Sequence, residues 1–347
     1  MVDISLEGKL FPVQASYQRY YQMAMRTAWS GENFIGMPGG RFTEEISMRL
    51  KAEAKKISPV KTVVSDGHTS LYCYKNSHQK VLFAIDAADK PEIERPDLLD
   101  VVQLYFKANH WPQRDYPANV VPIVNGNGVL SGRRIKKLCS LRDRNKTHDL
   151  IFVSRVWGGI EHNVRCFETL KQLPGRNLLL AIFTPPSKAS SSEYEMQKID
   201  ARNDLEEIGI RCTNKPISLQ QLWRMTASSR VVFLRAGKHL CIPWRMLDLL
   251  AMGSVVVTDS VPYPEWPEPL VQDTHYCSLN IPRPVDTRAG PLQSYGLNSD
   301  LITSLIANPD RRAAISTAAI DYFSTYGCPE AVGSYIRKNI ERVIQEQ

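Results

Sequence analysis

The stretch RVVFLRAGKHLCIPWRMLDLLAMGSVVVTDS (230–260) decides the fold class of this chain. Its apolar runs at 230–236 and 254–260 predict two buried strands, and the amphipathic run at 244–253 predicts a helix between them. Gly253 stands at the position where a helix commonly ends. A strand, a helix and a second strand in this order predict a parallel sheet with a right-handed crossover.

The same alternation of strands and helices extends upstream and downstream of this stretch. Short apolar runs that are typical of strands also occupy the first third of the chain. The predicted strands are 61–66, 80–86, 100–106, 119–124, 148–156 and 177–183, and the predicted helices are 15–29, 43–56, 161–173, 190–209, 218–229 and 329–345.

These elements predict an α/β protein with two Rossmann-like lobes that face each other across a cleft. The expected divisions are a first lobe at 1–140, a second lobe at 141–328 and a C-terminal helix at 329–347, which can cross back to the first lobe. Ligands of such sheets bind at the carboxyl ends of the strands. The loops that follow the strands are therefore where binding residues are expected.

The composition is that of an ordinary globular protein. The chain has 347 residues, of which 43% are hydrophobic and 23% charged, and its formal net charge is +7. No apolar run reaches the ~18 residues of a membrane span, and the N-terminus does not resemble a secretion signal, so we expect a cytoplasmic protein. Seven scattered cysteines without a C-x-x-C pair predict reduced thiols rather than a disulfide framework or a zinc site.

Arg245 and Asp248 lie in the first turns of the helix predicted at 244–253. Residues three apart share one face of a helix. Arg245 and the free N–H groups of this helix start can contact an anion, and the Asp248 carboxylate can accept hydrogen bonds from ribose hydroxyls. The alternative is an ordinary strand–helix–strand unit with an Arg–Asp pair on its surface.

The segment RMLDLLAMGSVVV (245–257) resembles the donor-binding segment of GT-B glycosyltransferases, especially the exostosin-like and family-1-like nucleotide-sugar enzymes. Those enzymes carry the pattern R/K-x-x-E-A-L-A-x-G-x-x-P-V, and this chain departs from it with Asp248 in place of Glu. The tail IDYFSTYGCPEAVGSYI (320–336) is similar to the ending A-x-x-Y-F-x-x-Y-x-S-P-E of such enzymes.

This resemblance implies a hexosyltransferase of the EC 2.4 class. The second lobe would bind a nucleotide-sugar donor, and the first lobe would bind the acceptor. The chain contains no D-x-D motif, the usual metal-binding signature of the other major glycosyltransferase fold. We therefore expect transfer without a metal or other cofactor, in which cations and helix N-termini stabilise the leaving diphosphate.

Candidate donor-binding residues follow the strands of the second lobe. Arg155 ends one strand and precedes a Gly-Gly turn and a helix start, an arrangement that suits a diphosphate. Two further cations stand in the loop before the 244–253 helix, and for each cation the alternative is a solvated side chain or a pair with a surface acid. The donor-binding candidates are Arg155, Gly158, Gly159, Arg235, Lys238, Arg245 and Asp248.

Candidate general bases stand where the strands of the first lobe end. An inverting enzyme needs a base near the acceptor hydroxyl. Asp66 and His68 follow the strand at 61–66, and Asp86 ends the strand at 80–86. The alternative for each is a turn cap or a solvated side chain, and a retaining enzyme needs none of them.

The segment 133–146 carries seven basic residues and one acid. This excess keeps a nucleic-acid or anionic-glycan contact open, and the alternative is a solvated linker. The acceptor is thus a glycan, a small molecule or a nucleic acid. Two other functions stay open, a DNA-base glucosyltransferase of the same fold and a non-catalytic two-lobe binding or scaffold protein. The oligomeric state does not follow from the sequence.

Overall fold

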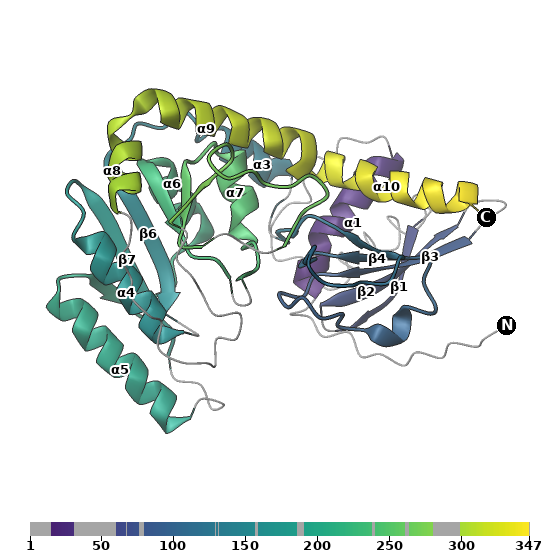
Figure 1. The fold of residues 1–347 in the computed structure, drawn as a ribbon, viewed down its shortest axis with the longest axis horizontal. Coiled ribbons are helices and arrows are strands. Elements are labelled where there is room, and N and C mark those ends of the chain that lie inside the picture. Colours follow the sequence, from purple (N-terminus) through teal and green to yellow (C-terminus); the bar gives the residue numbers. More distant parts are fainter. Residues whose placement is uncertain are drawn as a thin grey trace, which may run out of the picture.

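The structure is a computed structural model with two β-sheets, each in its own lobe (Figure 1). It describes residues 15–30, 60–66, 68–75, 80–128, 130, 132–156, 159–185, 191–237, 240–260, 264–279 and 299–346. The helix predicted at 43–56 lies outside these residues. All seven cysteines lie within them, and none forms a disulfide.

The first sheet has five strands in sequential order, β1 to β5. β1, β2 and β3 pair antiparallel, whereas β3, β4 and β5 pair parallel, so this sheet is mixed rather than wholly parallel. Because β1 and β3 are both antiparallel to β2, strands β1, β3, β4 and β5 all end at the same edge. The strands are β1 (Val60–Asp66), β2 (Thr69–Lys75), β3 (Lys80–Asp86), β4 (Leu104–Lys107) and β5 (Val120–Pro122).

The second sheet has six strands, all parallel, in the order β8-β7-β6-β9-β10-β11. Numbered from the first strand of this lobe, the order is 3-2-1-4-5-6, which is that of a Rossmann fold. Its apolar strands are buried because helices cover both faces. The strands are β6 (His148–Val156), β7 (Asn177–Phe183), β8 (Arg211–Thr213), β9 (Ser229–Leu234), β10 (Val256–Thr258) and β11 (Cys277–Ser278).

Helices follow most strands of the second lobe, and two helices run from it toward the first lobe along one side of the molecule (Figure 1). Ser191 and Ser218 cap α5 and α6 by accepting hydrogen bonds from the main-chain N–H three residues later. The helices are α1 (Ala15–Ser30), α3 (Gly132–Cys139), α4 (Ile160–Lys171), α5 (Ser192–Glu207), α6 (Leu219–Ala227), α7 (Arg245–Ala251), α8 (Ser299–Ala307), α9 (Pro309–Tyr322) and α10 (Pro329–Glu346).

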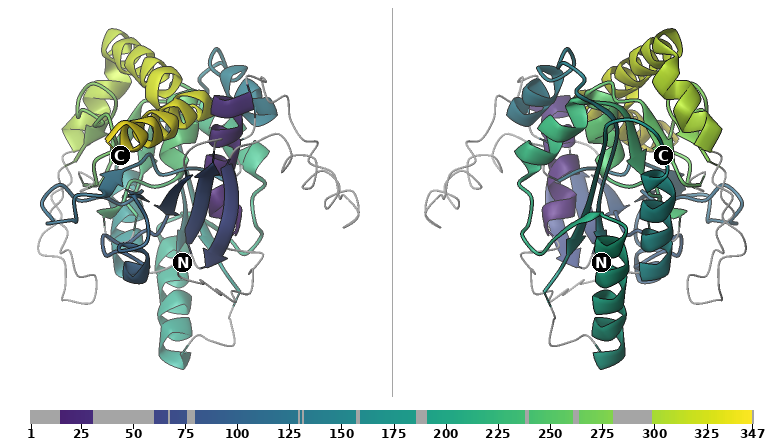
Figure 2. Two further views of the ribbon diagram at one scale, coloured as in Figure 1. Left: turned by 90° about the vertical axis from the view of Figure 1, so that its right-hand side faces the viewer. Right: turned by 90° about the vertical axis from the view of Figure 1, so that its left-hand side faces the viewer.

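The C-terminal helix α10 crosses back to the first lobe, where it packs against α1 (Figures 1 and 2). The Tyr335 hydroxyl on α10 donates a hydrogen bond to the carbonyl of Pro122 at 2.9 Å. A single apolar core extends from α1 and β3 through α7 to α10. The structure thus confirms the α/β fold with parallel strands, and no helix in the described ranges combines the length and apolarity needed to cross a bilayer.

Candidate functional site

The strand order of the second sheet reverses between β6 and β9, and this reversal positions the candidate site. The pairing of these strands ends at Ile151 and Val232, whereas β6 continues to Val156. The two strands therefore separate toward their carboxyl ends. A crevice at this switch point is the usual ligand position in such sheets.

The N-terminus of α4 lies beside this switch point and has no side-chain cap. Its N-cap residue is Gly159, whose φ of 67° is in the left-handed region that favours glycine. The Nη1 atom of Arg235, which follows β9, is 4.0 Å from the point where a Cβ would stand on Gly159. The main-chain N–H groups of the first turn and a guanidinium thus meet at one place, which suits an anion.

Two other predicted cations lie at the same edge, in different surroundings. Arg155 is the penultimate residue of β6 and is exposed. The Arg245 Nη1 donates a hydrogen bond to the carbonyl of Val153 at 3.3 Å, where β6 has separated from β9. Burial lowers the pKa of Arg245, and the nearby Asp248 opposes that shift. Gly158 and Lys238 lie outside the described residues.

Asp248 is enclosed between the lobes and does not join this group of residues. One carboxylate oxygen accepts a hydrogen bond from Asn127 Nδ2 at 2.6 Å, and the other accepts one from Trp223 Nε1 at 2.8 Å. Asp248 is 2% exposed to solvent. Because both oxygens are engaged, Asp248 is not available to a ribose in this conformation. We assign it a structural role at the junction of the lobes.

Asp248 also predicts a pH dependence of stability. Burial raises its pKa to about 6, from 3.8. The folded state therefore keeps this proton up to a higher pH than the unfolded state does. As the pH rises from about 4 to about 6, we expect the free energy of unfolding to fall by roughly 2–3 kcal/mol from this group alone.

Urea titrations at a series of pH values, on the wild type and on Asp248→Asn, measure this contribution. We expect the decline between pH 4 and pH 6 to be smaller in the variant, whatever its overall stability. Parallel profiles for the two proteins would show that Asp248 has an ordinary pKa.

Asp259 is a buried residue of the same edge that the sequence analysis did not single out. It follows β10, and its Oδ1 accepts hydrogen bonds from the main-chain N–H of Ala236 at 2.8 Å and of Ser260 at 3.0 Å. Its Oδ2 lies 2.6 Å from the Nε2 of His162, in the first turn of α4. The signal in the sequence that could have indicated Asp259 is a carboxylate directly after a predicted buried strand. Asp259 connects the loops that follow β6, β9 and β10.

The three candidate bases lie along one edge of the first sheet. Asp66 ends β1 and pairs with Thr69 in the ladder, and its side chain lies outside the described atoms. The His68 Nδ1 lies 3.4 Å from a carboxylate oxygen of Glu94. This hydrogen bond is the main reason why the pKa of His68 is raised and that of Glu94 is lowered.

Asp86 is fully buried at this edge, and its carboxylate accepts three hydrogen bonds and forms one ion pair. It accepts hydrogen bonds from the main-chain N–H groups of Ala88 at 2.9 Å and Glu94 at 3.1 Å, and from the Tyr105 hydroxyl at 3.0 Å. It also forms an ion pair with Lys107, 3.0 Å from its Nζ, and both side chains are 0% exposed. This surrounding gives Asp86 a structural role rather than contact with an acceptor.

The edge that carries these bases faces the second lobe. Asn125, just after β5, donates a hydrogen bond to the carbonyl of Ile242 in the second lobe at 2.8 Å. The main-chain N–H of Glu265 donates to the carbonyl of His110, just after β4, at 2.9 Å. The carboxyl ends of the first sheet and the loops of the second lobe are therefore in contact.

Several cations of the basic segment donate hydrogen bonds within the protein, among them Arg142, Arg144 and Lys146. Arg142 donates to the carbonyl of Ala251 at the end of α7, and Lys146 donates to the carbonyl of Ala227 at the end of α6. These cations satisfy the last carbonyls of two helices. Exposed cations of this segment stand on α3, at Arg133, Arg134, Lys136 and Lys137, and between α3 and β6, at Arg144 and Lys146.

Two facing α/β lobes, with a Rossmann-ordered sheet in the second, form the type of fold found in GT-B glycosyltransferases, as the sequence resemblance implied. No protein-family model matches the chain, and no curated protein matches its sequence. Among solved structures it is similar to a glycosyltransferase from Rickettsia africae, with 12% identity, a TM-score of 0.45 and coverage of 71% of this chain and 64% of that one.

Two other solved structures show the same level of similarity. HepE from Anabaena, solved with UDP and glucose, has 13% identity and a TM-score of 0.46, over 70% of this chain and 64% of that one. Sucrose-phosphate synthase from Thermosynechococcus elongatus has 12% identity and a TM-score of 0.44, over 67% and 54%. The match spans less than two thirds of the length of each of these proteins.

Proposed function

We propose that this protein is a glycosyltransferase that moves a sugar from a nucleotide-sugar to an acceptor bound between the lobes. The observation that carries the proposal is the meeting of Arg235 with the uncapped N-terminus of α4 at the switch point. A nucleotide-sugar releases a nucleoside diphosphate, whose negative charge increases as the glycosidic bond breaks. Preorganised N–H groups and guanidinium groups stabilise such charge.

In this proposal the cations and the helix start replace a metal ion in the transfer step. Arg155 is exposed at the end of β6, within the same group of loops as Arg235. Arg245 lies deeper, where its hydrogen bond to Val153 maintains the separation of β6 from β9. Arg155 and Arg235 therefore contact the diphosphate, and Arg245 supports the crevice.

Titration calorimetry of the full chain with UDP, GDP, TDP and ADP tests the donor site. We expect at least one diphosphate to bind, and Arg235→Ala to weaken that binding by about tenfold or more, because a charge-assisted hydrogen bond is lost. Arg176→Ala is the matched control, since Arg176 is exposed just before β7, at the opposite edge of the sheet. If none of the four diphosphates binds to the folded protein, the proposal fails.

For the acceptor side we propose His68 as the general base, in preference to the buried Asp86. An imidazole that a carboxylate orients at one nitrogen can take a proton at the other. Glu94 is that carboxylate, at 3.4 Å from Nδ1. Glu94 is thus a positioning residue, and it acts on the reaction through His68.

Glu94→Gln is expected to shift the acid limb of the pH–rate profile to lower pH. The Glu94 interaction raises the pKa of His68, so its loss lets the imidazole become neutral at a lower pH. His68→Gln should lower kcat by about 10²-fold or more and leave donor affinity unchanged. An unshifted acid limb in Glu94→Gln, with normal folding, would exclude His68 as the base.

A further inference from the structure

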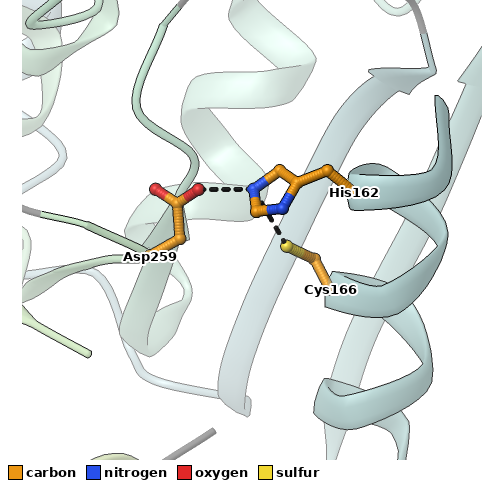
Figure 3. A group of neighbouring side chains, drawn as sticks. All are labelled: His162, Cys166 and Asp259. Atoms are coloured by element: carbon orange, nitrogen blue, oxygen red, sulfur yellow. Dashed lines mark hydrogen bonds and ion pairs between the residues drawn. The ribbon is translucent and has the colours of Figure 1, made fainter. Parts of the chain in front are cut away.

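His162, Cys166 and Asp259 bring three metal-ligating atoms together where the first turn of α4 meets the end of β10 (Figure 3). The imidazole nitrogen, the thiol sulfur and a carboxylate oxygen all lie within 4.8 Å of one another, and all three residues are buried. In the described ranges this is the only group of His, Cys and acidic residues with such geometry. We propose that it is a binding site for a divalent transition metal ion, Zn²⁺ being the ion that fits its ligands best.

The arrangement around the imidazole argues against a catalytic relay. Both Asp259 Oδ2, at 2.6 Å, and Cys166 Sγ, at 3.7 Å, approach the same ring nitrogen, Nε2 of His162. A Cys–His–Asp relay needs the acid and the thiol at opposite nitrogens of the ring. The three ligand atoms instead lie within 4.8 Å of one another, close enough for one metal ion to contact all of them once the side chains adjust.

Two of the three ligand separations can be compared directly with those of a zinc site, and the carboxylate oxygen and the sulfur lie within 4.8 Å of each other. Zn–N and Zn–S bonds of about 2.0 and 2.3 Å in a tetrahedron separate nitrogen and sulfur by roughly 3.5 Å. The observed separation of Nε2 and Sγ is 3.7 Å. Nε2 and Oδ2 lie at hydrogen-bond distance, 2.6 Å, and would move apart by about 0.7 Å when the metal replaces the shared proton.

The surrounding structure orients the ligands. His162 and Cys166 are four residues apart on α4, so they share one face of that helix. The other carboxylate oxygen of Asp259 is fixed by the N–H groups of Ala236 and Ser260, which directs Oδ2 toward His162. Outer hydrogen bonds of this kind are typical of metal ligands. Three protein ligands leave one coordination position for water.

The site would tie together the loops that bound the switch point. It joins the first turn of α4 to the ends of β9 and β10, close to Gly159, whose Cβ position is 4.0 Å from the Cβ of His162. An ion bound by these buried ligands would hold the loops in place. The inference stands independently of the proposed function.

Metal analysis of the purified full chain tests the inference directly. Protein expressed with added ZnCl₂, freed of any histidine tag and dialysed, should contain about one zinc per chain by mass spectrometry. Cys166→Ser and Asp259→Asn should lower this content several-fold. Cys277→Ser should retain it, because Cys277 is equally buried but lies outside the cluster.

Cobalt substitution of the wild type avoids any dependence on the folding of variants. Refolding with CoCl₂ should produce a thiolate-to-cobalt charge-transfer band in the near ultraviolet. A folded wild type that contains no zinc and shows neither this band nor a change in Tm on addition of ZnCl₂ would overturn the inference. Full zinc content in Cys166→Ser would also overturn it, because the ligand set would be wrong.

Discussion

Gly333→Ala is expected to lower the free energy of unfolding by about 2–4 kcal/mol. An alanine ordinarily stabilises the interior of a helix by about 1 kcal/mol relative to glycine. At this position in α10, however, a Cβ would lie 2.0 Å from the carbonyl oxygen of Ala24 and 3.1 Å from the Cβ of Ala28, both on α1. The added methyl group would force α10 away from α1, because the atoms it meets belong to the main chain.

Urea unfolding of the full chain, followed by circular dichroism, measures this change. Ser334→Ala is the matched control, because Ser334 is the next residue of α10 and is exposed. The control should change stability by less than about 0.5 kcal/mol. A Gly333→Ala variant that is as stable as the wild type would show that α1 and α10 do not pack this closely.

Lys107→Met is expected to destabilise the protein by about 3–5 kcal/mol, because it leaves the buried Asp86 without its cation. Lys107 Nζ has no hydrogen-bond partner among the described residues beyond the ion pair with Asp86. Burial lowers the pKa of Lys107, and Asp86 opposes that shift. Each of these two buried charged groups is therefore stabilised by the other.

The double variant Asp86→Asn/Lys107→Met shows whether the destabilisation comes from the lost ion pair or from the lost packing of the lysine side chain. It removes both charges, and we expect it to be more stable than Lys107→Met in the same urea titration. A double variant less stable than Lys107→Met would indicate that packing of the lysine stem, rather than an unpaired carboxylate, explains the loss.

The second lobe could be predicted from the sequence because its strands are buried on both faces and alternate with amphipathic helices. The predicted elements at 148–156, 161–173 and 177–183 became β6, α4 and β7 with small changes in their bounds. In the first lobe, β2 was missed, although Asp66-Gly67 is a hairpin signal just before it. Because β2 pairs antiparallel with β1 and β3, the mixed character of the first sheet was missed with it. α8 and α9 were also missed.

Only those parts of the candidate site that follow from the order of strands and helices along the chain could be predicted from the sequence. The alternation of strands and helices predicts a parallel sheet, whose strands all end at one edge. This places Arg155, Gly159 and Arg235, which stand at or just after strand ends, at the same edge. The partner of Asp248 is Asn127, which is 121 residues away, and that of His162 is Asp259, which is 97 residues away. Such pairs depend on how the lobes and loops pack, which no local pattern reveals.

A crystal structure of the full chain with the nucleoside diphosphate that binds most tightly would locate the donor site. We predict that its diphosphate lies at the switch point, within about 3.5 Å of the first N–H groups of α4 and of the Arg235 guanidinium. A diphosphate bound elsewhere, with this crevice closed by packed side chains, would contradict the claim.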